Sequence, residues 1–281
     1  MIHVVCFSGG KDSTALILWA KENLPEFTTV FCDAGWEHPI TYAYVSEINR
    51  TLLDGKLVTL RSEKYPDGFV PLVIDRKGFP SVRRRFCTSE LKVFPLHRYY
   101  EALEDEVTSY QGIRADESAA RAAMNQREWV DDAGGYWIER PLLQWSAEDC
   151  FAIMSKHNVQ PNPLYLMGSS RVGCYPCIMT GLAELKSLLR ATPDIRQRLI
   201  DLEAQVNKEI PITEERRWPA TFFKAGTIPA RFCSITGVNK KGEVAHVPTA
   251  EDVFRYIESV DEDQLPMFPS RSCMSVYNLC E

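Results

Sequence analysis

The sequence has no long apolar run, no internal repeat and no surplus of positive charge. None of its apolar stretches approaches the ~20 residues that a membrane-spanning helix needs, so we expect no membrane association. The absence of repeats and low-complexity tracts excludes solenoid, collagen-like and disordered classes. A formal net charge of −6 disfavours a surface that coats a polyanion. Any site for an anion must therefore be local.

A charged leader and an even cysteine count are missing as well. The chain enters a strand-like stretch at Ile2 with no positively charged segment ahead of it, from which we expect a cytoplasmic protein. Nine cysteines form an odd set, which argues against the closed disulfide framework of a secreted scaffold. So many thiols in an intracellular chain favour metal binding or redox chemistry.

Short β-branched runs alternate with helical stretches from residue 2 onward, which predicts an α/β fold with a doubly wound, mostly parallel sheet of the Rossmann-like type. We expect strands at Ile2–Phe7, Thr28–Phe31, Lys56–Leu60, Val107–Gly112 and Tyr136–Ile138, and helices at Ser13–Asn23, at Ile40–Leu53 and after Ser146. Residues 64–88 and 114–134 lack clear periodicity and indicate long loops over a site.

The sequence pattern changes after Cys177 from alternating strands and helices to long helical stretches. Gly181–Ile210 is charged and helical in period, with a break at Pro193, and Thr249–Val260 carries another helix signal. We therefore expect two domains: residues 1–180 as the nucleotide-binding α/β domain, and residues 181–281 as a helical lobe with a cysteine-bearing tail.

A glycine-rich loop lies between the first expected strand and helix. Paired glycines let successive backbone N–H groups point into one concavity, and the following helix N-terminus adds its positive dipole end, which suits a di- or triphosphate. Lys11 adds a mobile positive charge, and Asp12 either caps the helix or helps to place Mg²⁺. The candidate residues of this loop are Ser8, Gly9, Gly10, Lys11, Asp12 and Ser13.

An isolated Gly-Gly pair would more often be an ordinary turn, but here the whole motif Ser-Gly-Gly-Lys-Asp-Ser is present at 8–13. It resembles the adenine-nucleotide α-hydrolase (PP-loop) superfamily, which includes ATP pyrophosphatases and the phosphoadenosine-phosphosulfate (PAPS) reductases. The resemblance implies the fold expected above and an adenine nucleotide as ligand.

Two further segments resemble the reductase branch of that superfamily. The segment 32–39, Cys-Asp-Ala-Gly-Trp-Glu-His-Pro, implies that Asp33, Gly35 and Glu37 order a ribose, an adenine amine or a metal ion; a helix-capping turn is the alternative. The segment from Gly112 to Arg121 resembles Gly-x-Arg-x-x-x-Ser-x-x-Arg. Its Arg114 and Arg121 are expected to clamp phosphate or sulfate oxygens, with surface ion pairs to neighbouring acidic residues as the alternative.

The segment that begins at Cys87, Cys-Thr-x-x-Leu-Lys-x-x-Pro, resembles reductase-like proteins and the ATP-pyrophosphatase component of DNA phosphorothioation systems. Adenylyl-sulfate reductases that hold a cluster carry two adjacent cysteines here, whereas this chain has one. A later segment, Asn162–Tyr165, is expected to form a structural turn.

Cys174 and Cys177 are spaced so that both sulfurs can face one metal ion or cluster. The resemblance implies a [4Fe-4S] cluster and adds Cys87 as a ligand; the fourth ligand must come from the tail, where we favour Cys273 over Cys280. A structural Zn²⁺ with four cysteines and a thioredoxin-like redox pair are the alternatives.

The remaining cysteines have other expected roles. Cys280 is a candidate nucleophile, because adenylyl-sulfate reductases use a C-terminal cysteine, although their Glu-Cys-Gly-Leu-His motif is absent. Cys6, Cys32 and Cys150 are expected to be small buried hydrophobes. Cys233 has no assigned role.

Three functions follow from these residues and the resemblance. The first is an ATP pyrophosphatase that adenylates an acceptor for sulfur transfer, with Lys11, Asp12 and Cys280 as catalytic residues. The second is a reductase that releases sulfite from adenosine phosphosulfate (APS) or PAPS with a thioredoxin-like donor. The third is a non-catalytic adenylate-binding subunit that leaves chemistry to a partner such as a cysteine desulfurase. A nucleic acid is one of the possible acceptors.

Overall fold

The computed structural model describes residues 1–208, 218–239, 241–261 and 265. They form two compact units. The first consists of Met1–Gly68 and Phe86–Tyr175, and the second of Phe69–Arg85 and the described residues from Pro176 onward. The sequence predicts one boundary near 180, whereas the described chain passes between the units three times. Each unit is described by itself.

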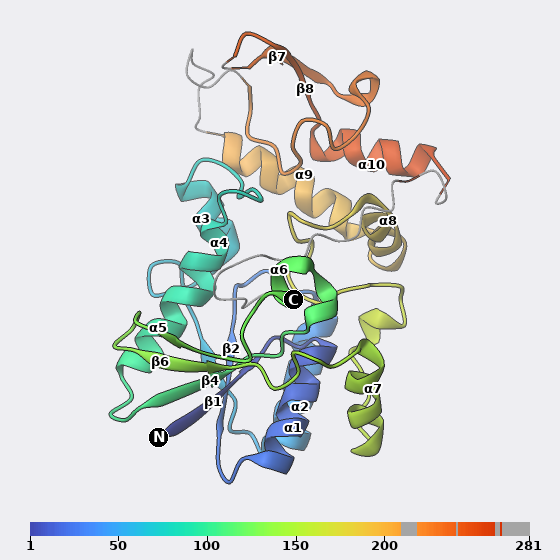
Figure 1. Cartoon of the computed structure of the whole chain (residues 1–281). Helices are drawn as coiled ribbons and strands as arrows, with labels where there is room; N and C mark the ends of the chain where they lie inside the picture. The colour runs from blue at the N-terminus through green and yellow to red at the C-terminus, as the bar shows by residue number, and fades with distance from the viewer. Residues whose placement is uncertain (209–217, 240, 262–264, 266–281) are drawn as a thin grey trace. The chain divides into compact units, whose positions relative to one another are not determined.

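The first unit is built on a six-stranded sheet with the order β3-β2-β1-β4-β6-β5 (Figure 1). The four pairings from β3 to β6 are parallel, and only β5 is antiparallel, to β6. The strands are β1 (Ile2–Phe7), β2 (Thr28–Cys32), β3 (Val58–Leu60), β4 (Val107–Tyr110), β5 (Arg127–Val130) and β6 (Tyr136–Glu139). This is the mostly parallel α/β fold that the sequence predicts.

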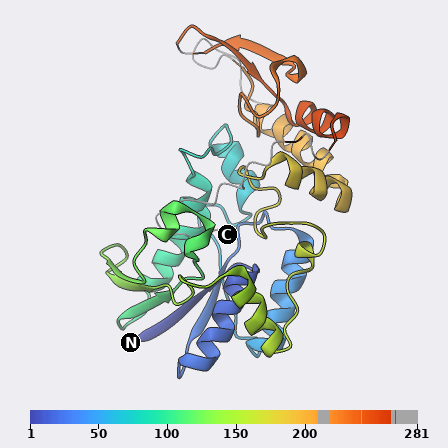
Figure 2. The ribbon, with the colours of Figure 1, turned by 45° about the vertical axis from the view of Figure 1, so that its right-hand side comes forward.

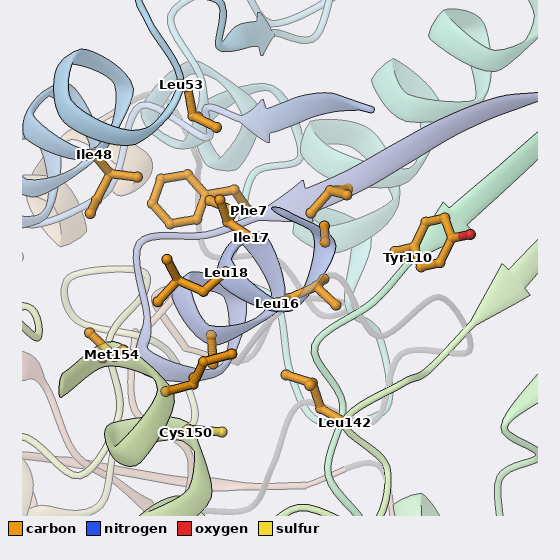
Figure 3. Packing of buried hydrophobic residues seen from close by; sticks show 14 of the residues in the cluster. Phe7, Leu16, Ile17, Leu18, Ile48, Leu53, Tyr110, Leu142, Cys150 and Met154 are labelled. Carbon is orange, nitrogen blue, oxygen red and sulfur yellow. The ribbon is translucent and has the colours of Figure 1, made fainter. Parts of the chain in front are cut away.

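One face of this sheet is covered by α1 (Lys11–Asn23), α2 (Pro39–Leu52) and α7 (Ala147–Lys156), as Figures 1 and 2 show. Side chains of these helices form one hydrophobic cluster with Phe7, Phe31 and Tyr110 of the strands (Figure 3). α1 is buried over most of its length, because β1 and α7 pack on opposite sides of it. The apolar composition of α1 therefore follows from its central place.

The opposite face of the sheet packs on α5 (Phe94–Glu101). Leu96 and Tyr100 of α5 join Val4, Val30 and residues of β4 and β6 in a second cluster. The short helix α4 (Phe86–Thr88) and the π-helical turn η1 (Ser89–Val93) lead directly into α5. Residues from Cys87 onward thus enter a helix that lies on this face.

The direction of chain progress through the sheet reverses between β1 and β4. From β1 the chain adds β2 and then β3 on one side, and it later returns to add β4 on the other side. In open parallel sheets, ligands bind outside the carboxyl ends of the strands at such a switch point. The loop Ser8–Ser13 follows β1 there, and the segment 111–114 follows β4.

The two segments that the sequence analysis predicts as uninterrupted loops contain regular structure. Residues 64–88 include α3 (Phe69–Asp75), and residues 114–134 include η2 (Ala115–Glu117), α6 (Ala119–Ala122) and β5. α3 buries Phe69, Leu72 and Val73 at helical spacing, and its proline stands in the first turn, where no intrahelical N–H bond is lost. The prediction is wrong at these elements because each is short.

The second unit packs three helices after Pro176 around one another and around α3. They are α8 (Leu182–Ala191), α9 (Asp194–Asn207) and α10 (Ala250–Ser259), and the break between α8 and α9 falls at the predicted proline. The rings of Phe79 and Phe222 lie 5.6 Å apart within this unit. The segment that contains α3 is therefore a genuine part of its core.

The second unit is not purely helical, contrary to the expected helical lobe. β7 (Ile235–Val238) and β8 (Val244–Val247) form an antiparallel hairpin after the short helix η4 (Ala230–Phe232). Val238 and Val244 are exposed, so the hairpin lacks the continuous apolar face from which a strand is recognised in a sequence. None of the helices in the described residues is long and apolar enough to cross a membrane.

Candidate nucleotide-binding site

The loop Ser8–Ser13 is held in shape by its own backbone and hydroxyl groups. Gly9 has a φ of +85°, and a Cβ atom there would come within 2.9 Å of the Thr41 side chain, so glycine is required at this position. The Ser13 hydroxyl lies 3.0 Å from that of Ser8 and donates to the Gly10 carbonyl oxygen over 3.1 Å. The helix that follows starts at Lys11, two residues earlier than predicted.

Asp12 lies at the centre of a buried ion-pair network. Its carboxylate is fully buried and accepts hydrogen bonds from Arg114 Nε at 2.7 Å and from Lys11 Nζ at 2.9 Å. Arg114 also binds Asp116 through Nη1 at 2.6 Å. Burial disfavours the charged guanidinium, but these two carboxylates outweigh it and raise the pKa of Arg114. The network fixes two cations beside the loop.

The close approach of two strand ends makes this network possible. A Cβ atom at Gly112 would lie 2.9 Å from the carbonyl oxygen of Asp12, so the segment after β4 passes directly against the first turn of α1. Arg121 is also buried, and it pairs with Glu117 four residues earlier in the chain. The predicted clamp residues Arg114 and Arg121 thus face carboxylates of their own chain, and their contact with an external anion stays a prediction.

A segment that the sequence analysis treats as a structural turn contacts the loop. Asn162 Nδ2 donates to the Gly9 carbonyl oxygen at 3.1 Å, and the Tyr165 hydroxyl accepts a hydrogen bond from the Lys11 backbone N–H at 2.9 Å. The ammonium group of Lys11 lies 5.6 Å from the centre of the Tyr165 ring. No sequence pattern links residues 162–165 to residues 9–11, so these two site residues were missed.

The predicted segment around Asp33 follows β2 at the same edge of the sheet. Asp33 Oδ1 accepts from the Tyr42 hydroxyl at 2.7 Å and from the Gly35 N–H at 2.9 Å, and Oδ2 accepts from Arg61 Nε at 3.0 Å. Burial and the neighbouring Asp33 carboxylate raise the pKa of Tyr42. Gly35 has a φ of +62° and leaves no room for a Cβ beside the Asp67 carbonyl oxygen.

Glu37 connects this segment to the first cysteine of the Cys174–Cys177 pair. It forms an isolated β-bridge with Cys174, and its Oε1 atom lies 3.9 Å from both Cys174 Sγ and Lys92 Nζ. Glu37 and Lys92 are both buried. The structure therefore brings together a carboxylate, an ammonium group and a thiol that the sequence analysis assigned to three separate motifs.

The four predicted metal ligands are only partly described. Cys87 and Cys174 belong to the first unit, Cys177 belongs to the second, and Cys273 lies outside the described residues, as does Cys280. Among the residues that are described, no three His, Cys, Asp or Glu side chains gather into a group that could hold a metal ion. The metal site and the role of Cys280 stay predictions.

The three cysteines expected to be buried hydrophobes differ from one another. Cys150 is fully buried, and burial together with the nearby Asp12 raises the pKa of its thiol. Cys6 and Cys32 keep partial solvent exposure, although they lie on central strands. Both still pack against the hydrophobic cluster of the α5 face, so they are half-buried rather than fully buried as expected.

Several known proteins are similar to this chain in sequence. Residues 2–180 match the family described as the phosphoadenosine phosphosulfate reductase domain. The chain is 34% identical over 281 residues to an uncharacterized 37.8 kDa protein in the gpa 5′ region of Escherichia phage 186, covering 82% of this chain and 81% of that protein. It is 37% identical over 94 residues to the adenosine 5′-phosphosulfate reductase of Allochromatium vinosum, covering 34% of this chain and 35% of the reductase.

A solved structure is also similar. The phosphoadenylyl-sulfate reductase of Candida auris, in its phosphate complex, matches with a TM-score of 0.48 and 18% identity, covering 62% of this chain and 81% of that chain.

Proposed function

The chain belongs to the phosphoadenosine phosphosulfate reductase family, and from this premise we propose that it is an enzyme that binds ATP in the loop Ser8–Ser13 and adenylates an acceptor for sulfur transfer. The observation that carries the proposal is the buried network in which Asp12 holds Lys11 and Arg114 beside the loop at the switch point of the sheet. Two fixed cations and a helix N-terminus suit a polyphosphate rather than a neutral ligand.

In the proposed reaction an acceptor oxygen attacks the α-phosphorus of ATP. The bond from the α-phosphorus to the oxygen that bridges to the β-phosphate breaks, and pyrophosphate leaves with that electron pair. Backbone N–H groups of Gly9 and Gly10 and the Lys11 ammonium group stabilise the charge of the departing pyrophosphate. A sulfur nucleophile then displaces AMP from the acceptor.

Asp12 does not suit the direct coordination of Mg²⁺ that the sequence analysis allows it. Its two oxygens are engaged by Arg114 and Lys11, and it is fully buried. We assign it the positioning of these two cations instead. Mg²⁺ would then be held by the phosphate oxygens of the nucleotide, and no step above depends on a protein ligand for it.

The thiols suit a metal group by their chemistry. Cys87, Cys174, Cys177 and Cys273 would hold a [4Fe-4S] cluster, or a zinc ion in the alternative, because both accept four thiolates. The buried Lys92 ammonium group lies 3.9 Å from Glu37 Oε1, which in turn lies 3.9 Å from Cys174 Sγ, so a buried ion pair stands beside one of these thiols. A bound cluster would supply electrostatic polarisation or electron transfer near the nucleotide.

A second candidate is the reduction of APS or PAPS to sulfite, and the similarity to the Allochromatium vinosum reductase favours it. In that reaction a thiolate, for which Cys280 is the candidate, attacks the sulfur of the phosphosulfate and the nucleotide leaves; a thioredoxin-like dithiol then releases sulfite. The single cysteine at position 87, where cluster-bearing reductases have two, favours the ATP reaction instead. A cysteine desulfurase as sulfur donor and a nucleic acid as acceptor are proposals that accompany the ATP reaction.

The decisive experiment compares product formation from ATP and from APS. Purified protein is incubated with ATP, Mg²⁺ and fractionated tRNA, DNA or small-molecule acceptors, and pyrophosphate and AMP are measured; a parallel reaction holds APS and a dithiol, and sulfite is measured. We expect pyrophosphate from ATP, with Lys11→Ala lowering its rate at least about 100-fold and Lys21→Ala, an exposed lysine on the same helix, leaving the rate unchanged.

Other products would change the proposal. Sulfite from APS without pyrophosphate from ATP would replace the ATP reaction by the reductase. Nucleotide binding with no product in any mixture, including one with a cysteine desulfurase, would favour the non-catalytic adenylate-binding subunit.

A further inference from the structure

Gln111 carries a buried acceptor that the described residues leave unused. Its side chain follows β4 and is 3% exposed. The backbone of Gln111 is satisfied, because its N–H donates to the Glu139 carbonyl oxygen and its own carbonyl oxygen accepts from the Ile113 N–H. The side-chain oxygen Oε1, in contrast, has no hydrogen-bond partner within the described part of the chain. A buried carbonyl oxygen without a donor costs free energy, so its presence calls for an explanation.

The place of Gln111 in the sheet indicates what it faces. Alternation along β4 puts Gln111 on the same face as Ser109, whose hydroxyl accepts from Tyr100 of α5 at 2.7 Å and lies 3.7 Å from Cys6 Sγ. Cys6 belongs to β1, the neighbour of β4 in the sheet. Gln111 therefore lies on the α5 face, at the carboxyl end of the strand that borders the switch point.

This part of the α5 face keeps access to solvent. Cys6 and Cys32 are partly exposed, whereas Val5 and Phe31, which point to the opposite face of the same strands, are buried. Ser8, the next residue of that alternation and the first of the phosphate loop, is partly exposed as well. The unused acceptor and the accessible strand residues thus occur together, next to the loop.

We propose that Gln111 Oε1 accepts a hydrogen bond from the nucleoside part of the nucleotide, and that Gln111 is a specificity-determining residue of the site. The inference rests on the proposed function and deepens it. An amide oxygen only accepts, and ionised phosphate oxygens offer it no donor, so its partner must carry an N–H or O–H group. In a nucleotide these are the exocyclic amine of the base and the hydroxyls of the ribose.

The same chemistry lets Gln111 distinguish ATP from analogues that lack the donor group. A site built to hydrogen-bond one group rejects an analogue that lacks it, because the buried oxygen then stays unpaired in the complex. We expect ATP to bind at least about 10-fold more tightly than the analogue without the relevant donor, which is ITP for the base amine and 2′- or 3′-deoxy-ATP for a ribose hydroxyl.

The test uses two variants, each of which removes a buried, unused acceptor, one within β4 and one at the residue that follows it. Gln111→Met keeps the shape of the side chain without its oxygen. Thr108→Val is the matched control, because Thr108 Oγ1 is also buried without a hydrogen-bond partner in the described residues, but Thr108 points to the opposite face of β4. Binding of ATP, the three analogues and pyrophosphate is measured by calorimetry, and the melting temperature is measured without nucleotide.

Both variants should melt at a higher temperature than the wild type. Only Gln111→Met should weaken ATP binding, by about 10-fold and to the level of one analogue, with pyrophosphate binding unchanged. One analogue should bind wild type more weakly than ATP does, but bind Gln111→Met as tightly as ATP does. The group that this analogue lacks is the donor to Gln111.

Two results would overturn the inference: equal ATP affinity in the two variants, or an equal loss of ATP and pyrophosphate affinity in Gln111→Met. If wild type released pyrophosphate from ATP while Gln111→Met bound ATP unchanged, the Gln111 inference alone would fail. If wild type bound neither ATP nor APS, the proposed function would fail with it.

Discussion

At the scale of single residues, the site is organised by acidic groups that hold basic ones. Asp12 and Asp116 share one guanidinium group, but only Asp12 is fully buried, whereas Asp116 is about half exposed. Removing one member of a buried pair leaves an uncompensated charge, while an exposed pair contributes little because water screens it. The two carboxylates should therefore differ strongly in their effect on stability.

We expect Asp12→Asn to lower the free energy of unfolding by about 3 kcal/mol. Asp116→Asn, the matched control on the same arginine, should cost no more than about 1 kcal/mol. Urea denaturation followed by circular dichroism measures both. Equal losses of unfolding free energy in the two variants would show that the burial of Asp12 does not determine how much its ion pair stabilises the protein.

The motif at 8–13 could be predicted because its composition, its position after a strand and its position before a helix all indicate a phosphate-binding loop. The contact of Tyr165 with Lys11 could not, because it depends on a chain return more than 150 residues later. The ion pair between Asp12 and Arg114 is hidden from the sequence for the same reason, since Gly112 must first bring the two segments together.

At the scale of elements, short length alone did not prevent prediction, because β3, with three residues, and β4 and β6, with four each, were predicted. β1 was predicted with its observed ends, because its run is β-branched and bounded by the glycine loop. α3 was missed because seven residues give too few turns for a helical period to stand out, and the β7–β8 hairpin was missed because Val238 and Val244 are exposed.

Glu203 of α9 shows how such elements are joined in the second unit. It is buried and accepts the backbone N–H of Phe222 at 2.7 Å and of Ala250, the first residue of α10, at 2.9 Å. Burial raises the pKa of Glu203 above its usual value of 4.5, although the two N–H groups oppose this. Its stabilising contribution is thus fully present below the usual pKa and is lost as the pH rises through the raised pKa.

We expect Glu203→Gln to cost about 1–3 kcal/mol of unfolding free energy at acidic pH, because its amide group cannot accept both N–H groups. The difference from wild type should shrink as the pH increases from 4.5. Urea denaturation between pH 4 and pH 8 checks this, with the exposed Glu258→Gln on α10 as control. A difference that grows with pH would contradict the assigned direction.

At the scale of the whole molecule, the family match covers residues 2–180 and thus every predicted ligand except the tail cysteines. If the chain holds a [4Fe-4S] cluster, anaerobically purified protein should be brown and contain about four irons per chain. Cys87→Ser and Cys174→Ser should lose colour and iron together.

Cys233→Ser, which changes a thiol outside the predicted ligand set, is the control and should keep both. If the protein held about one zinc ion per chain and no iron, the cluster would be ruled out in favour of the four-cysteine zinc site. Equal metal content in all three variants would remove these cysteines from the ligand set.

The insertion of Phe69–Arg85 into the first unit has a consequence for biosynthesis. α3 contacts α9, and seven residues are too few for a helix to persist in water without its packing surface. The ribosome makes α3 long before α9, and at typical rates of synthesis the interval is roughly 10 s. During that interval the apolar side chains of α3 lack the helix on which they pack in the folded chain.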